Sequence, residues 1–127
     1  MRSYEFILED IDQAGLNQVE AFVDKLWAKL GIDVEFTRHF IERLNSERNG
    51  KPISTAELVR LFKREYEMYG AAIRKLDDRD EAVLKDLTTQ LNLPFVIRDT
   101  NDGKTLIAKT IMRKPNFRSP DPEFAVK

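Results

Sequence analysis

Residues 16–30 have the most regular pattern of apolar and polar positions in the chain. Apolar side chains recur there every three or four residues, which places them on one face of an α-helix. They are Leu16, Val19, Phe22, Val23, Leu26, Trp27 and Leu30. Gly31 follows the last of them, and glycine commonly ends a helix. The pattern predicts a helix over residues 16–30 with one buried face.

Two more helices are predicted in the first half of the chain. Residues 34–45 repeat the helical spacing, and Asp33 stands where a side chain can cap the first turn. Residues 54–69 open with Ser54, followed three residues later by Glu57, which is the sequence of a capping box. Both helices should therefore have a defined start as well as a buried face.

The start of the chain is expected to be separate from the main domain. Residues 1–12 show helical spacing over a short stretch only, which is marginal for an isolated helix. Ala14 and Gly15 are expected to break it. We therefore predict an N-terminal arm or leader over residues 1–15 and a single domain over residues 16–127.

The pattern changes to that of β-strands towards the C-terminus. Residues 93–98 and 105–112 are rich in apolar and β-branched side chains. The segment between them contains Asp102-Gly103, a pair typical of the turn of a β-hairpin. In the second run, an apolar set alternates with a set that mixes aliphatic side chains and cations, so the two sets point to opposite faces. This predicts an antiparallel hairpin with one face in the core.

Segments on both sides of the hairpin complete the predicted sheet. Residues 81–92 fit either a helix or a strand, and Thr88 and Thr89 favour a strand over residues 83–89. Residues 124–126 are expected to add a last short strand. Helices followed by strands are an α+β pattern. We predict N-terminal helices packed on a small antiparallel β-sheet formed by the C-terminal half.

The composition narrows the kinds of site that the chain can hold. Its 127 residues include no cysteine, which excludes disulfides and thiolate metal sites. They include one histidine, His39, so a histidine-rich metal centre cannot form within one chain. We therefore expect neither a metal nor another cofactor. No apolar run approaches the roughly 20 residues of a membrane span, and no basic stretch leads into a signal-peptide core. The sequence predicts a soluble protein of a reducing compartment, without a membrane partner.

The net charge of −1 hides an uneven distribution. Residues 1–37 hold eight acidic and three basic residues, a net charge of −5, whereas the remainder holds 14 acidic and 18 basic residues, a net charge of +4. An acidic first part and a mildly basic body suit either an autoinhibitory arm or two separate contact surfaces. Uneven charge without functional meaning is the alternative interpretation.

Three polar residues on the second predicted helix are candidates for a catalytic site. Glu35, His39 and Arg43 are four residues apart and would lie on one helix face. A carboxylate one turn away favours the charged form of a histidine, and the arginine would place a fixed cation next to it. This arrangement suits acid–base chemistry beside a bound phosphate. Ordinary ion pairs on a solvated helix face are the alternative.

Candidates for binding nucleic acid lie at the end of the second strand run. Lys109 and Arg113 fall on its charged face, and Lys114 and Arg118 extend the charge past the predicted strand. Cations interleaved with aliphatic side chains suit a sheet face that binds a polyanion. The alternative is an edge strand whose charges prevent aggregation.

Three segments together resemble a known family. They read FTRHFIERLN (36–45), ISTAELVRLFKREY (53–66) and LPFVIRDTNDGKTLIAKTIMRKPNF (93–117). In this order they are similar to small uncharacterised proteins encoded by tailed phages, many of them phages of cyanobacteria. The resemblance covers about residues 36–126, and KTIMRKPNF is its most specific part. It implies a phage protein that acts in the host cytoplasm or in the virion.

The opening MRSYEFILE is separately similar to the short leader on packaged head proteins of large myoviruses. A prohead protease removes such leaders by cutting after a glutamate in an aliphatic-x-Glu setting. Here the cut would follow Glu9 in Ile7-Leu8-Glu9. This second resemblance implies packaging in a phage head.

The order of helices and sheet is also similar to the ribonuclease fold of barnase, colicin and RelE-type toxins. Those proteins cut RNA with a dispersed set of His, Arg, Lys and Thr or Ser side chains. The resemblance implies catalytic roles for His39, Arg43 and Thr110. It implies phosphate contacts for Lys109 and Arg113. This chain departs from the pattern because it has no second histidine, so a two-histidine acid–base pair cannot form.

Two functions remain open from the sequence. The first is a protein that binds RNA or cleaves it without a metal, in which His39 or Glu35 takes the proton of the 2′-hydroxyl. Arg43, Lys109 and Arg113 would then stabilise the pentavalent phosphate. The second is a non-enzymatic phage protein, either packaged in the head or bound to a host protein through the acidic arm. Only the first function requires these side chains to share one cleft.

Overall fold

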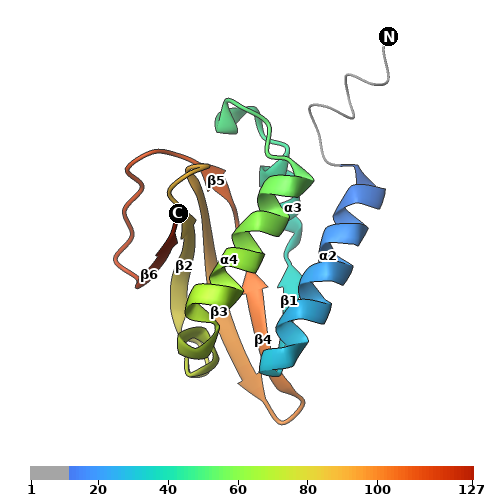
Figure 1. The fold of residues 1–127 in the computed structure, drawn as a ribbon, viewed down its shortest axis with the longest axis vertical. Helices are drawn as coiled ribbons and strands as arrows, with labels where there is room; N and C mark the ends of the chain where they lie inside the picture. The colour runs from blue at the N-terminus through green and yellow to red at the C-terminus, as the bar shows by residue number, and fades with distance from the viewer. Residues whose placement is uncertain (1–11) are drawn as a thin grey trace.

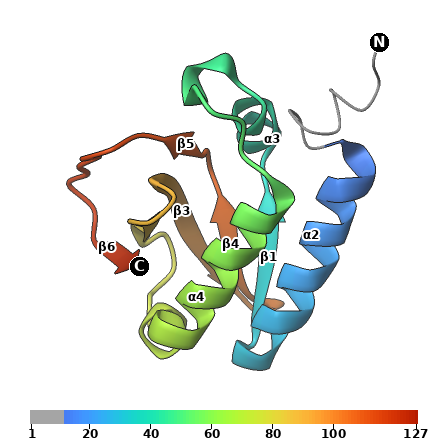
Figure 2. The same ribbon diagram turned by 45° about the horizontal axis from the view of Figure 1, so that its top comes forward.

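The computed structural model describes residues 12–127 as two layers, with helices covering one face of a β-sheet (Figure 1). The helices are α2 (Gln13–Trp27), α3 (Arg38–Leu44) and α4 (Thr55–Arg74), with 3-10 turns η1 (Ala28–Leu30) and η2 (Glu47–Asn49). The strands are β1 (Ile32–Phe36), β2 (Glu81–Asp86), β3 (Leu91–Thr100), β4 (Gly103–Ala108), β5 (Met112–Arg113) and β6 (Glu123–Val126). The two long helices, α2 and α4, lie side by side across the sheet, and α3 lies at the end where β5 is found (Figures 1 and 2).

The sheet is mixed and has the strand order β1-β4-β3-β2-β6, with β5 pairing with the start of β3. The three central strands are antiparallel neighbours, whereas the outer strands β1 and β6 run parallel to β4 and β2. The β3–β4 connection closes where Thr100 pairs with Gly103, whose φ is +121°. Glycine adopts this conformation without the steric cost that other residues meet. The predicted antiparallel hairpin is confirmed.

The core lies between the helices and the sheet. Its largest members are Trp27, Phe40, Phe62 and Phe95, all fully buried. The Trp27 and Phe62 rings meet edge to face, with their centroids 6.2 Å apart. The indole N–H of Trp27 donates to the Phe62 carbonyl at 3.3 Å, so the one polar atom of this side chain is satisfied. Aromatic packing of this kind joins α2 to α4.

The helix predicted over residues 34–45 was wrong in its first half. Residues from Asp33 to Phe36 belong to β1, where Val34 is buried and its neighbours along the strand are exposed. Thr37, and not Asp33, caps the helix that follows, because its Oγ1 accepts the N–H of Phe40 at 3.0 Å. Parallel pairing with β4, far away in the sequence, overrides the local helical spacing.

The first helix begins earlier than predicted. Asp12 caps α2 by accepting the N–H of Gly15 on its Oδ1 at 2.7 Å. Ala14 and Gly15 therefore lie inside the helix, and the break predicted there was wrong. The rest of the predicted arm or leader, including the cut predicted after Glu9, lies outside the described residues.

The α+β class, with N-terminal helices packed on the sheet, is confirmed. The sheet differs from the predicted one because two of its strands run parallel to their neighbours and β1 comes from the N-terminal half. The strand predicted over residues 83–89 is confirmed for residues 83–86, which belong to β2. It was wrong for residues 87–89, because residues 87–90 form a turn. The last strand, β6, lies where one was predicted. Within residues 12–127, no helix is long and apolar enough to cross a membrane.

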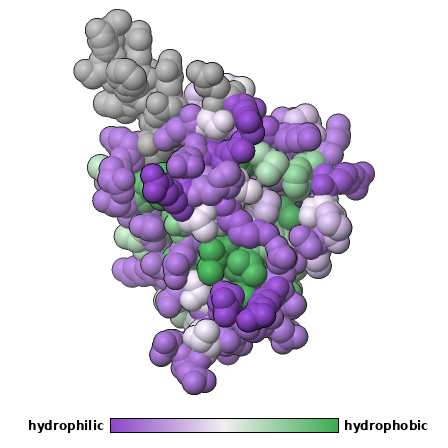
Figure 3. Space-filling view, turned by 180° about the vertical axis from the view of Figure 1, so that it is seen from behind, coloured by the Kyte–Doolittle hydropathy of each residue, from purple (hydrophilic) through white to green (hydrophobic). Residues whose placement is uncertain are grey.

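The sheet face opposite the helices carries apolar side chains near its centre (Figure 3). Ile107 of β4 and Val96 of β3 are half-buried cross-strand partners on this face. Glu35 of β1 pairs with Ile107, and Glu81 of β2 pairs with Val96. An acidic residue therefore borders the apolar pair on each side.

Candidate nucleic-acid interface

An open pocket of about 600 Å³ lies between α3, η2 and the segment that follows β4. Its lining residues are His39, Arg43, Ser46, Arg48, Asn49, Thr110, Ile111, Met112, Arg113 and Lys114. Of these described lining residues, five carry a basic side chain and none carries a carboxylate. Ligand pockets commonly span roughly 300–1,000 Å³. The pocket therefore has room for an anionic group of nucleotide size.

Thr37 holds the start of α3 against the chain that leaves β4. Its backbone N–H donates to the Ala108 carbonyl at 3.2 Å, and its hydroxyl donates to the Lys109 carbonyl at 3.0 Å. Thr110 follows directly in the sequence. This junction therefore brings Thr110 to the same pocket as His39, although the two are far apart along the chain.

Asn49 joins the other end of α3 to β5. It is 7% exposed, and its Nδ2 donates to the carbonyls of Arg43 at 2.9 Å and Leu44 at 3.3 Å. Its Oδ1 accepts the backbone N–H of Arg113 at 3.2 Å. All these partners are backbone groups. The buried Asn49 side chain therefore fixes the spacing between the backbone of α3 and that of β5.

Four basic side chains of the pocket remain available to a ligand. We call His39, Arg43, Arg48 and Lys114 the basic quartet. Arg43 is half-buried and the other three are exposed. Their side chains have no hydrogen-bond or ion-pair partner among the residues that the structure describes. Their N–H donors therefore face the pocket uncompensated by a carboxylate from its described lining side chains.

The guanidinium of Arg113 also reaches the pocket but is bound within the protein. It makes two parallel hydrogen bonds to the Glu57 carboxylate, at 2.9 and 3.0 Å. It also donates to the carbonyls of Lys51, Pro52 and Thr89 at 3.1, 2.8 and 2.8 Å. These contacts use all the donors that a guanidinium has. We therefore assign Arg113 a structural role in place of the predicted contact with nucleic acid.

Glu57 is the acidic partner of Arg113 in this ion pair. Burial raises the pKa of Glu57, but the hydrogen bonds from Arg113 and Ser54 and the Arg113 charge outweigh it, so the pKa lies below its ordinary value. The ion pair therefore stays charged at neutral pH. It ties the first turn of α4 to Arg113 of β5.

Three predicted site residues lie away from the pocket. Glu35 is exposed on β1, so the predicted pairing of Glu35 and His39 on one helix was wrong. Lys109 is ion-paired with Glu81 and lies on the open face of the sheet, because side chains alternate along the strand. Arg118 is exposed in the segment between β5 and β6 and does not line the pocket. Of the eight predicted residues, His39, Arg43, Thr110, Arg113 and Lys114 come together.

The sequence does not predict that Ser46, Arg48 and Asn49 line the pocket. They lie in a turn-rich segment after α3, where no periodicity relates a residue to a face. The backbone N–H of Arg48 donates to the Ser46 hydroxyl at 3.2 Å, which keeps the turn compact. The one sequence feature that points to this segment is Arg48, a basic residue that follows His39 and Arg43 closely in the chain.

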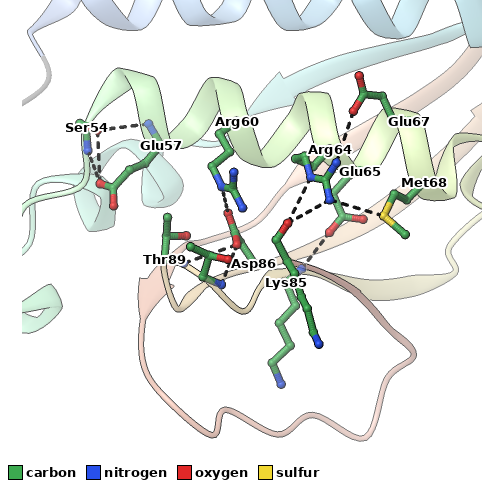
Figure 4. A network of polar contacts seen from close by, with 12 residues as sticks. Ser54, Glu57, Arg60, Arg64, Glu65, Glu67, Met68, Lys85, Asp86 and Thr89 are labelled. Atoms are coloured by element: carbon green, nitrogen blue, oxygen red, sulfur yellow. Dashed lines mark hydrogen bonds and ion pairs between the residues drawn. The ribbon is translucent and has the colours of Figure 1, made fainter.

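A second cluster of titratable groups lies inside the protein, between α4 and β2 (Figure 4). Glu65 is fully buried, and its Oε2 accepts the backbone N–H of Lys85 at 3.1 Å. Asp86 is also fully buried and accepts a hydrogen bond from Nε of Arg60 at 2.9 Å. Burial raises the pKa of Glu65 to about 9; the N–H of Lys85 opposes this rise and the charge of Asp86 adds to it. Across residues 12–127, no group of three or more acidic or histidine side chains is placed to hold a metal ion.

The fold and the pocket together define an α+β protein with a cationic site at one end of its sheet. No protein-family model matches the chain, and no curated protein or solved structure matches it. The chemistry of the pocket is therefore the basis for inferring a function.

Proposed function

We propose that this protein binds single-stranded RNA by holding backbone phosphates in the cationic pocket. The observation that supports this most directly is the convergence of the basic quartet in a pocket where none of the lining side chains that the structure describes is a carboxylate. The whole chain has a net charge of −1, so this concentration of positive charge is local. A local basic patch on a protein without net positive charge attracts a polyanion to one place.

The residue types suit phosphate in particular. Each of the two free arginines, Arg43 and Arg48, presents a planar fork that can hold two phosphate oxygens at once. The hydroxyls of Ser46 and Thr110 can donate to the remaining phosphate oxygens or to a ribose hydroxyl. The concave shape favours an unpaired strand, because duplexes are read by elements that protrude into a groove.

Binding is favoured over cleavage by the position of the acidic candidate. In the predicted mechanism, one group takes the 2′-hydroxyl proton and another gives a proton to the leaving 5′-oxygen. His39 can serve as one of these groups, but Glu35 lies on β1, outside the pocket. Among the lining side chains that the structure describes, no carboxylate takes its place. The proposed function is therefore RNA binding.

The salt dependence of binding tests this proposal. Affinity for a fluorescent single-stranded RNA octamer, measured by anisotropy over a series of salt concentrations, should fall steeply as salt rises. Each lost phosphate contact lowers the log–log slope by about 0.7. We expect that change in Arg43→Ala and again in Arg48→Ala, with weaker binding at every salt concentration.

Arg38→Ala is the matched control for these variants. Arg38 lies on the same helix as Arg43 and carries the same charge, but it pairs with Glu42 at 3.5 Å and does not line the pocket. Its slope should equal that of the wild type. A wild-type protein that does not bind at low salt, or an Arg38→Ala variant that loses as much slope as Arg43→Ala, contradicts the proposal. The first of these outcomes would favour the protein-binding alternative.

A further inference from the structure

A smaller pocket of about 150 Å³ adjoins the cationic pocket, and Lys114 lines both. It lies between the turn that joins β2 to β3 and the chain that leaves β5, and it is open to solvent. Exposed residues on its rim are Leu87, Gln90, Pro115 and Asn116. A ligand group held by Lys114 can therefore continue into this second pocket without leaving the surface.

Backbone strain is concentrated at this pocket. Gln90 has a φ of +65° and Asn116 a φ of +58°. Only three non-glycine residues of the described chain have a positive φ, and two of them line this pocket. Left-handed backbone is uncommon for residues that carry a side chain, and strained residues gather at ligand sites. Here the strain presents two amide side chains at the rim of one pocket.

The chemistry of the rim matches that of a nucleobase. Leu87 is 50% exposed, which is unusual for a leucine, and Pro115 beside the pocket is also exposed. Such apolar groups can pack against the flat face of a base. The amides of Gln90 and Asn116 each carry donors and an acceptor, which can pair with the polar edge of a base. A cavity of about 150 Å³ holds a single benzene-sized ring.

We infer that this pocket receives a pyrimidine base of the bound strand, next to a phosphate held by Lys114. The inference rests on the proposed function and adds a base preference to it. A pyrimidine is one six-membered ring of the size that this pocket holds, whereas the fused second ring of a purine would extend out of it towards solvent. The cationic pocket supplies affinity for the strand, and the smaller pocket supplies the contact with its base.

The test compares three labelled octamers with the same phosphates: oligocytidine, oligoadenosine and an abasic strand. Wild-type protein should bind oligocytidine roughly fivefold or more tighter than the abasic strand, because a single net hydrogen bond to the base contributes about that much. Oligoadenosine should bind less tightly than oligocytidine. In the double variant Gln90→Gly, Asn116→Gly, oligocytidine should bind no more tightly than the abasic strand. Glycine adopts a positive φ readily, so this variant keeps the fold.

Arg79→Gly is the matched control, because Arg79 is the third non-glycine residue with a positive φ, at +71°, and lies outside both pockets. It should keep the wild-type ratio of affinities for oligocytidine and the abasic strand. Equal wild-type affinity for all three strands overturns the base site and leaves phosphate binding intact. Oligoadenosine that binds as tightly as oligocytidine overturns it too, as does a double variant that keeps the wild-type ratio. Absence of binding by every strand at low salt overturns the proposed function itself.

Discussion

Glu65 illustrates what a single residue determines in this protein. Its place in α4, four residues after Leu61, puts it on the apolar face of a helix that the sequence predicts well. The side chain is consequently fully buried against β2, and its Oε1 has no hydrogen-bond partner among the described residues. Helical spacing identifies the buried face, but it cannot tell that a carboxyl group will be kept there in its neutral form.

Replacing Glu65 by glutamine should remove a loss of stability at high pH. Burial raises the pKa of Glu65 from 4.5 to about 9, so between these values the folded protein keeps a proton that the unfolded chain releases. The stability that the folded protein gains from this bound proton is fully present below pH 4.5 and is lost as the pH rises towards 9. Over this range the folding equilibrium constant decreases roughly tenfold per pH unit. The stability of Glu65→Gln relative to wild type should therefore increase from about pH 5 to about pH 8 in urea unfolding.

Glu67→Gln is the control for the Glu65→Gln prediction. Glu67 lies on the same helix, its side chain is 47% exposed, and it pairs with Arg64 at 3.8 Å. This variant should follow the wild-type pH dependence. If Glu65→Gln also keeps the wild-type dependence, Glu65 does not hold a proton in the folded state.

At the scale of elements, the sequence predicts what is local and misses what is paired at long range. The β3–β4 hairpin is predicted because its two strands and its turn are adjacent in the sequence. β1 is not predicted, because Phe36 and Phe40 also have helical spacing and the parallel partner of β1 lies about 70 residues away. The strand expected to reach Met112 ends at Ala108, so the alternation that placed Arg113 beside Lys109 on one face does not continue.

The junction at Thr37 should control the pocket without contacting a ligand. Thr37→Ala removes the cap of α3 and the hydrogen bond to the Lys109 carbonyl. Loss of a cap costs about 1 kcal/mol of stability. Because α3 then loses its tie to the chain after β4, RNA affinity in the anisotropy assay should fall as well.

Ser54→Ala makes the equivalent change at the cap of α4, where Ser54 accepts the N–H of Glu57 at 3.1 Å. It should lower the free energy of unfolding by a similar amount while leaving RNA affinity unchanged. Equal affinities for Thr37→Ala and Ser54→Ala would show that the junction does not position the pocket.

At the scale of the whole molecule, the pocket is assembled from two distant parts of the chain. Residues 39–49 and 110–114 supply the lining that the structure describes. The residue types were informative, since His39, Arg43 and Lys114 were selected from the sequence and do share the pocket. Their convergence was not predictable, because it depends on backbone contacts made by Thr37 and Asn49. Arg113 was also selected for its charge, as a contact for nucleic acid, but its guanidinium donors are used within the protein.

The most direct test of the account is to map the RNA contact on the folded protein. Titration of ¹⁵N-labelled protein with single-stranded RNA, followed by amide correlation spectra, reports which backbone groups change environment. We predict the largest shift changes in residues 39–49 and 110–114, the two segments that line the cationic pocket. Amides of α2 should change little. Shift changes centred on the open sheet face around Ile107, or none at low salt, would contradict the assignment of the pocket as the RNA-binding site.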